Sequence, residues 1–207
     1  MKLLAFDTCL DKTYVTLYSD DNFINRVIVS NDKNYHSAYL ISTIVEVLKN
    51  NNLLPNDLEY IATDIGPGSF TGIRACTTVA RMLAQQLNIK TIGVSSLEIL
   101  SKILGDQDFV ALDARKNKAY VFENKILGAV ELEKVDEMIK GRRVITDNSL
   151  LERFKPNAKE IISYQANDYQ LGEILAQIAI TKIQNNEITE WKSLKPLYIQ
   201  PPPVFGR

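Results

Sequence analysis

A short sequence pattern occurs twice in this chain, at a constant offset of 106 residues. Asp7 ends an apolar run and is followed seven residues later by Tyr14-Val15, and Asp113 ends a second apolar run and is followed seven residues later by Tyr120-Val121. In both places the aspartate closes one predicted strand and the Tyr-Val pair lies in the next. The repeat predicts an internal duplication in which a β-hairpin opens each of two lobes.

The order of strand and helix signals is that of an α/β protein. In the first half we expect strands at 2–6, 13–18 and 23–29, a helix at 36–51, a strand at 61–65, a helix at 71–87 and a strand at 89–94. The second half restarts with strands at 109–112, 118–123 and 126–132 and ends in a helix at 168–184. We therefore expect two lobes, residues 1–104 and 105–207, the second with an extended tail that includes prolines 201–203.

The charge balance argues against a chain that binds nucleic acid by itself. Residues 1–104 hold nine Lys and Arg against ten Asp and Glu, and residues 105–207 hold fifteen against fifteen, which gives the net charge of −1. A domain that grips nucleic acid alone usually has a basic excess. The balance therefore disfavours RNA binding by this chain alone.

The cysteine and apolar content indicates a cytoplasmic protein with no membrane contact. Cys9 and Cys76 are too few for a disulfide framework, which favours a reducing compartment. Asp7 interrupts the N-terminal apolar run, so no signal peptide fits, and no stretch reaches the ~18 apolar residues of a membrane helix. One histidine and two cysteines distant in sequence offer no metal-ligand set, so we expect no bound metal and no cofactor in the isolated chain.

The most specific motif is the run Gly66-Pro67-Gly68-Ser69-Phe70-Thr71-Gly72-Ile73-Arg74, between a predicted strand and a predicted helix. Free N–H groups at a helix start attract an anion. A Walker A loop is excluded because no lysine follows Gly72, and the dinucleotide pattern is excluded because position 71 is threonine. A plain turn, with Ser69 or Thr71 as helix cap, is the alternative.

Two predicted helices indicate a partner surface, with burial by the other lobe as the alternative. Helix 36–51 is apolar over an arc wider than one face, and helix 71–87 carries small residues and few charges. We expect one stripe of each helix to face its own sheet and a second stripe to face a partner, which self-association would cover in the lone chain. The residues expected on the partner stripe are Leu40, Ile44, Val47, Ile73, Arg74, Thr77, Ala80 and Arg81.

Three segments together resemble the TsaB (YeaZ-like) family of bacterial tRNA threonylcarbamoyladenosine biosynthesis subunits. They are Leu4-Ala5-Phe6-Asp7-Thr8, the run from Gly66 to Arg74, and Leu112-Asp113-Ala114-Arg115-Lys116. The resemblance implies an α/β fold of two tandem ribonuclease-H-like lobes of the actin/Hsp70/sugar-kinase (ASKHA) type. It also implies a non-catalytic subunit that supports addition of the threonylcarbamoyl group to adenosine 37 of tRNAs reading ANN codons. The implied partners are a TsaD-like transferase, in a heterodimer, and a TsaE-like ATPase.

The resemblance also bears on the site. In duplicated folds of this type Asp7 and Asp113 would face an inter-lobe cleft, where two carboxylates could hold a metal–phosphate. The chain lacks the lysine and the hairpin glycine of a self-sufficient nucleotide site, so ATP or ADP near Gly68, Ser69, Thr71, Gly72 and Arg74 is expected only in the complex. Actin-like sugar kinases have a glycine after the hairpin aspartate, and here Thr8-Cys9 follows. TsaD has a metal-binding histidine pair that this chain lacks. An actin-like-fold metallopeptidase (glycoprotease) or phosphotransferase remains the alternative.

Overall fold

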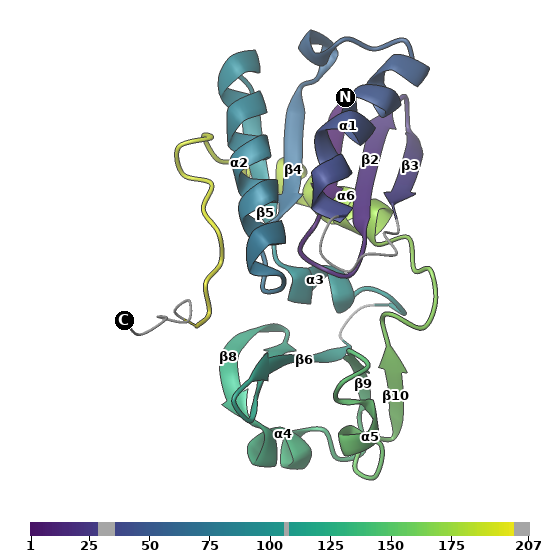
Figure 1. Ribbon diagram of the computed structural model, residues 1–207, viewed down its shortest axis with the longest axis vertical. Coiled ribbons are helices and arrows are strands. Elements are labelled where there is room, and N and C mark those ends of the chain that lie inside the picture. Colours follow the sequence, from purple (N-terminus) through teal and green to yellow (C-terminus); the bar gives the residue numbers. More distant parts are fainter. Residues whose placement is uncertain (29–35, 106–107, 201–207) are drawn as a thin grey trace. The chain divides into compact units, whose positions relative to one another are not determined.

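The computed structural model describes residues 1–28, 36–105 and 108–200, which fold as two units (Figure 1). The first unit contains Met1–Ile99 and Gln170–Pro196, and the second contains Leu100–Tyr169 and the segment that starts at Leu197. The expected strand end at residue 29 and the proline tail at 201–203 lie outside the described residues. Within those ranges, no helix has both the length and the apolar character needed to cross a membrane.

A five-stranded mixed sheet forms the centre of the first unit, in the order β3-β2-β1-β4-β5. Its strands are β1 (Leu3–Asp7), β2 (Thr13–Ser19), β3 (Asn22–Ile28), β4 (Tyr60–Asp64) and β5 (Lys90–Val94). β1, β2 and β3 pair antiparallel, whereas β4 and β5 continue the sheet parallel to β1. Parallel pairing needs long connections, and these carry the helices α1 (Leu40–Asn50) and α2 (Phe70–Leu87).

Helices cover both faces of this sheet. On one face Leu4 and Phe6 of β1 share a core with side chains of α1 and α2, and α6 (Leu171–Gln184) contacts all five strands from the other (Figure 1). All five residues of β1 are buried, which explains its uninterrupted apolar run. The shorter elements are the 3₁₀ helices η1 (His36–Tyr39) and η2 (Pro55–Asp57) and the helix α3 (Ser96–Leu100).

The second unit repeats this topology. Its strands are β6 (Phe109–Arg115), β7 (Lys118–Glu123), β8 (Lys125–Glu131), β9 (Arg143–Thr146) and β10 (Glu160–Ser163). Their order, β10-β9-β6-β7-β8, is that of the first sheet taken from the opposite edge, with the same antiparallel and parallel pairs. The helices α4 (Leu132–Met138) and α5 (Leu151–Phe154) join the core through Val135 and Phe154. The predicted α/β fold of two tandem ribonuclease-H-like units is confirmed.

The 106-residue offset finds equivalent strands, but the two hairpins differ in register by one residue. Asp7 pairs with Tyr14 in the first unit. In the second, Tyr120 pairs with Leu112, and a bulge follows at Asp113. Asp7 is buried, whereas Asp113 is exposed. The two aspartates therefore share a position in the chain pattern but not an environment.

The observed division corrects the expected boundary at residues 104 and 105. Residues 170–196, placed by the sequence in the second lobe, belong to the first unit. Gly172 allows this, because α6 approaches β2 so closely that an added Cβ would lie 2.5 Å from Thr16 Oγ1. Lys182 of α6 also pairs with Glu98, at 3.1 Å. A helix that follows the last strand of one unit thus covers the sheet of the other.

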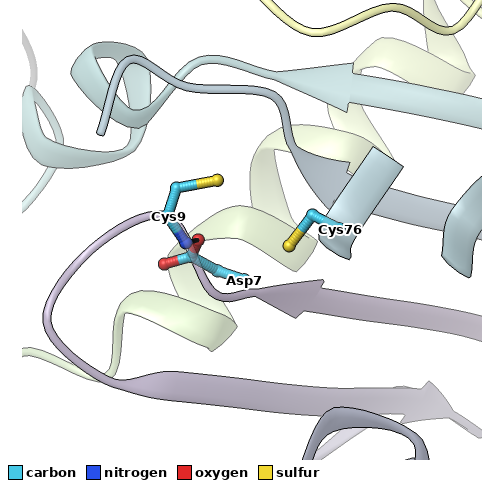
Figure 2. A group of neighbouring side chains, drawn as sticks. All are labelled: Asp7, Cys9 and Cys76. Atoms are coloured by element: carbon cyan, nitrogen blue, oxygen red, sulfur yellow. Dashed lines mark hydrogen bonds between the residues drawn. The ribbon is translucent and has the colours of Figure 1, made fainter. Parts of the chain in front are cut away.

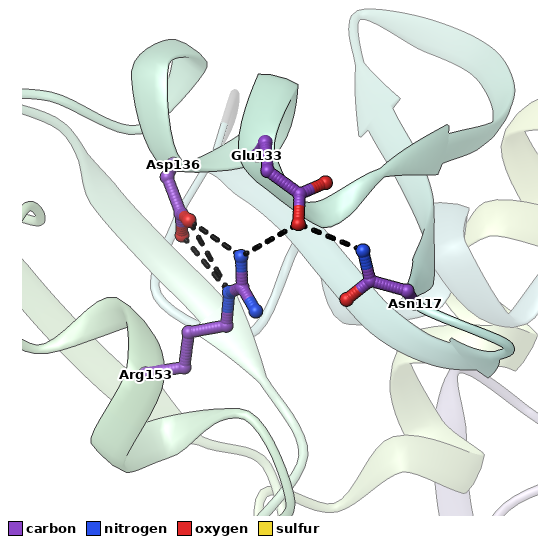
Figure 3. Close-up of polar contacts among 4 residues, drawn as sticks. All are labelled: Asn117, Glu133, Asp136 and Arg153. Carbon is purple, nitrogen blue, oxygen red and sulfur yellow. Dashed lines mark hydrogen bonds and ion pairs between the residues drawn. The ribbon is translucent and has the colours of Figure 1, made fainter.

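A polar network positions the helices of the second unit (Figure 3). Asn117, in the turn between β6 and β7, donates a hydrogen bond to Glu133 of α4 at 2.8 Å, which lowers the pKa of the Glu133 carboxyl. Arg153 of α5 contacts Glu133 at 3.7 Å and Asp136 at 2.8 Å. Because these side chains are largely solvated, we assign them an orienting role and little net stability.

Candidate functional site

The run from Gly66 to Arg74 links β4 to α2, as the sequence predicted. Ser69 is the N-cap of α2, and its hydroxyl oxygen accepts a hydrogen bond from the Gly72 N–H at 3.2 Å. The interpretation of the motif as a turn with a helix cap is therefore confirmed, with Ser69 as the cap. Because α2 is a long helix of 18 residues, its dipole and the free N–H groups of its first turn favour an anion at its N-terminus.

The glycines of this run let its backbone pack against the turn after β1. A Cβ atom at Gly68 would lie 2.3 Å from the carbonyl oxygen of Cys9, and one at Gly72 would lie 1.8 Å from that of Thr8. Ser69 N donates to Cys9 O at 2.7 Å, and Thr8 Oγ1 donates to Gly72 O at 2.8 Å. This packing accounts for both glycines without a ligand.

Four of the five loop residues expected near a nucleotide reach solvent. Gly68, Ser69, Thr71 and Arg74 are exposed, and Gly72 is buried. The Arg74 guanidinium lies 4.0 Å from the centre of the Phe70 ring, so the helix start presents one cation stacked on an aromatic side chain. This surface offers hydrogen-bond donors and positive charge to an anion, and nucleotide binding there remains a prediction.

The two hairpin aspartates have different chemistry available to them. Asp7, at the end of β1, is 1% exposed, and its Oδ1 accepts the Cys9 N–H at 2.5 Å. Asp113, at the corresponding place in the second unit, is exposed, and its Oδ1 accepts the Arg115 N–H at 2.7 Å. A nucleotide has no access to the Asp7 carboxyl in this conformation, so its expected place beside a nucleotide is not supported within the first unit.

A buried acidic cluster surrounds Asp7, and the sequence analysis did not find it (Figure 2). Asp7 and Cys9 lie at the end of β1, Asp64 ends β4, and Cys76 lies on α2. One carboxylate oxygen of Asp7 and the two sulfur atoms all lie within 4.8 Å of one another. The Cys9 thiol donates a hydrogen bond to the backbone carbonyl oxygen of Asp64 at 3.5 Å. The only sequence signals were the short Asp-x-Cys spacing and the position of Cys76, four residues after Gly72 on the buried face of α2.

Burial dominates the electrostatics of this cluster. It raises the pKa of Asp7, with the charge of Asp64 as the next cause, and it raises the pKa of the Cys9 thiol. Burial also raises the pKa of Asp64 to about 6, against hydrogen bonds from Ser96 and Gly66 N–H that favour the carboxylate. Burial acts in the same direction on Cys76, but hydrogen bonds, the strongest from Cys9, outweigh it and leave the Cys76 pKa lowered.

The expected partner stripe is wrong in its orientation. Leu40, Ile44 and Val47 are at most 4% exposed and belong to the core beneath α1. On α2, Ile73, Thr77 and Ala80 are buried as well, Arg74 is exposed, and Arg81 is half-buried within 5.9 Å of the Trp191 ring centre. The reason is helical phase: Gly72, Cys76, Ala80 and Ala84 recur every four residues and let α2 lie close to its own sheet.

A different set of side chains forms the outer apolar face of the two helices. Ile41 and Val45 of α1 are 54% and 58% exposed, and Met82 of α2 is 46% exposed. These three line an apolar groove of about 80 Å³ between the helices. Its other lining residues are Leu4, Ile44, Leu48, Pro55, Leu58, Val79 and Leu83. The helices predicted to carry an apolar surface do carry one, at positions shifted by about one residue.

Comparison with known families decides where the chain belongs. The family model described as "TsaD: tRNA N6-adenosine threonylcarbamoyltransferase" matches residues 27–183. The chain belongs to this family. A relative in Buchnera aphidicola subsp. Schizaphis graminum, named tRNA threonylcarbamoyladenosine biosynthesis protein TsaB, is 29% identical over 84% of this chain and 97% of its own length. The TsaB protein of Bacillus subtilis is 34% identical over 58% of this chain and 53% of its own. The predicted resemblance is confirmed.

Solved structures agree on the fold. The chain described as "YeaZ from Pseudomonas aeruginosa" has a TM-score of 0.73 at 20% identity, over 95% of this chain and 99% of that one. A second structure from the same organism, of an uncharacterized protein with similarity to peptidase YEAZ, has a TM-score of 0.79 at 20% identity, over 96% and 99%. At this identity the likeness establishes the fold alone.

Proposed function

We propose that this chain is an accessory subunit in the synthesis of threonylcarbamoyladenosine in tRNA, at adenosine 37 of tRNAs that read ANN codons. Its role is to support a TsaD-like transferase. The observation that carries the proposal is the match to proteins named TsaB, one of which aligns over 97% of its own length. The family match to TsaD over residues 27–183 indicates that subunit and transferase share a fold.

The chemistry of the chain supports an accessory role without catalysis. One histidine in the whole sequence provides no histidine pair for a catalytic metal. At the exposed loop the reactive groups are the hydroxyls of Ser69, which caps α2, and of Thr71, together with the Arg74 guanidinium, which stacks on Phe70. A nucleophile would need a base within hydrogen-bond reach, and the described contacts of these two hydroxyls include none. No observation favours the peptidase or phosphotransferase alternatives.

The outer face of α1 and α2 is the surface we assign to the transferase. Ile41, Val45 and Met82 expose large apolar side chains around one groove, and such a patch on a soluble protein marks an interaction site. Charged side chains stand beside it rather than in it, with Glu46 and Lys49 exposed on α1 and Arg74 on α2. This is the arrangement of an apolar centre and a polar rim. A TsaD-like chain of the same fold would pack its own helix pair here, and a second copy of this chain would take its place when the partner is missing.

The remaining partners act through the complex. A TsaE-like ATPase joins it, tRNA is contacted through it, and ATP or ADP binds near Gly68 to Arg74 only when the transferase completes the site. The loop supports nucleotide binding only in the complex, because it offers the N-terminus of a helix and one arginine but lacks a P-loop lysine.

The proposal is tested by the modified nucleoside itself. The chain is expressed in bacteria depleted of their own TsaB, and threonylcarbamoyladenosine in their tRNA is measured by liquid chromatography and mass spectrometry. We expect the modification to return with this chain and to require the TsaD-like partner. Normal growth with no return of the nucleoside would contradict the proposal.

A further inference from the structure

The buried cluster of Asp7, Cys9, Asp64 and Cys76 brings together four groups that become anions when ionised. None is more than 2% exposed. Figure 2 shows Asp7 at the end of β1 and Cys9 in the turn that follows, with the sulfur of Cys76 on α2 pointing toward them. Cys9 links two of the acidic residues, since its backbone N–H donates to Asp7 Oδ1 and its thiol donates to the backbone carbonyl oxygen of Asp64.

In its ionised form this cluster would need a positive charge to offset its burial. Desolvating ionised carboxylates is costly unless they are paired or bind a metal. The charges that act most strongly on Asp7 are those of Asp64 and Cys76, and no cationic side chain of the described residues is among the main influences on the four groups. The Asp7 Oδ2 atom is buried and has no hydrogen-bond partner within the described part of the chain.

Donor groups around the cluster are already arranged as they are around metal ligands. The backbone N–H of Thr8 donates to the Cys76 sulfur at 3.1 Å, and that of Cys9 donates to Asp7 Oδ1. The Ser96 hydroxyl contacts both oxygens of Asp64 at 2.8 and 2.7 Å, and Gly66 N–H donates to Oδ1 at 2.6 Å. Outer contacts of this type fix ligand orientation and offset ligand charge.

We propose that this cluster binds one Zn²⁺ ion through Asp7, Cys9, Cys76 and Asp64. Two sulfur and two carboxylate ligands suit zinc and exclude magnesium and calcium, which take oxygen alone. In tetrahedral zinc sites with Zn–S bonds of about 2.3 Å, sulfur ligands are about 3.8 Å apart. The Asp7, Cys9 and Cys76 donors lie within 4.8 Å of one another, so they need to draw together by roughly 1 Å. The Asp64 carboxylate lies outside this group of three and has to move further to become the fourth ligand.

The proposed site departs from the expectation of no bound metal, which rested on the distance between Cys9 and Cys76 in the sequence. Binding displaces the protons of the ligands, and complete burial means that the ion enters as the chain folds. Zinc would join the end of β1, the end of β4 and α2, and so hold the loop from Gly66 to Arg74 in place. Its role is structural, because four protein ligands leave no open position for a substrate.

Metal analysis of the full chain tests this site. The chain is produced with zinc in the medium, dialysed against a mild chelator and analysed by mass spectrometry of the elements. We expect one zinc per chain, retained in Asp113→Asn and lost in Cys76→Ala and Asp7→Asn. Wild-type chain with no zinc, both as purified and after refolding with Zn²⁺, would overturn the proposal, as would Cys76→Ala that keeps its zinc.

Cobalt reports which atoms bind and covers the case of variants that fail to fold. After refolding with Co²⁺, wild-type chain should show sulfur-to-cobalt charge-transfer absorption in the near ultraviolet, weaker in Cys9→Ser. Ser96→Ala keeps all four ligands, and we expect it to bind Zn²⁺ roughly 10–100-fold more weakly in competition with a chelator. Circular dichroism checks the fold of every variant. Co²⁺ bound without this absorption would show that the thiols are not ligands and would refute the site.

Discussion

Replacing Gly72 by alanine tests how α2 is fixed to the first hairpin. A Cβ atom there would be 1.8 Å from the carbonyl oxygen of Thr8 and 2.7 Å from its carbonyl carbon. Both are backbone atoms, so no side-chain rotation relieves the clash. The turn is also tied to the helix, through Thr8 Oγ1 to Gly72 O and Ser69 N to Cys9 O. To make room for the added Cβ, α2 and the turn after β1 must therefore move apart as whole segments.

The size of the effect follows from two opposing terms. Reaching ordinary contact at 3.4 Å requires a displacement of about 1.6 Å. Overpacking of this kind costs about 3 kcal/mol, at the upper end of the usual range because only backbone can move. Alanine in a helix gains about 1 kcal/mol over glycine. The net loss is about 2 kcal/mol of unfolding free energy, which lowers the melting temperature of a chain this size by roughly 4–8 °C.

Thermal melting of the full chain by circular dichroism measures this loss. Thr78→Ala is the matched control, because Thr78 is exposed on the same helix and its replacement changes helix propensity without a clash. We expect Thr78→Ala to melt at or slightly above the wild-type temperature. If Gly72→Ala melts at the same temperature as this control, the close approach of α2 to the turn does not depend on the glycine, and the reasoning is refuted.

Three further predictions concern the two helices, α6 and the nucleotide. Ile44→Glu should lose at least about 3 kcal/mol of stability because the new charge is buried, whereas Val45→Glu should stay within about 0.5 kcal/mol; similar urea midpoints for the two would reverse the helix phase described above. Gly172→Ala should cost about 1 kcal/mol, less than Gly72→Ala, because its closest contact is the side-chain atom Thr16 Oγ1, which can move at the expense of its hydrogen bond to Asn25; an unchanged melting temperature would show that α6 does not need this contact. Calorimetry should detect no micromolar binding of ATP to the lone chain, and such binding would contradict assembly of the nucleotide site in the complex.

The topology was predictable because the same local sequence pattern occurs in both halves of the chain. Asp7 and Asp113 each follow an apolar strand segment, and the constant offset between them predicted the two sheets of equivalent strand order that the structure has. The position of α6 was not predictable in this way. Whether a helix covers the sheet that precedes it or the one at the other end of the chain depends on a non-local fit, here Gly172 against Thr16.

The candidate site was predictable in its location and not in its side chains. Helix α1 contains two apolar arcs, and both Leu40 with Ile44 and Ile41 with Val45 have the spacing of one helical face. Sequence periodicity identifies both arcs, but only packing against the sheet decides which is buried. The sequence did not predict the acidic cluster for a related reason: Cys9 and Cys76 become neighbours only when α2 packs on the turn after β1.

One measurement tests the central claim, that this chain supports a TsaD-like transferase through the outer face of α1 and α2. The tagged chain is co-expressed with the partner, and co-purification is scored for wild type, Val45→Glu and Ser42→Glu. Val45 lines the apolar groove, whereas Ser42 is exposed on the same helix outside it. We expect Val45→Glu to lose the partner, because a charge would be buried unpaired, and Ser42→Glu to retain it. Val45→Glu that keeps the partner as well as Ser42→Glu does would contradict the account.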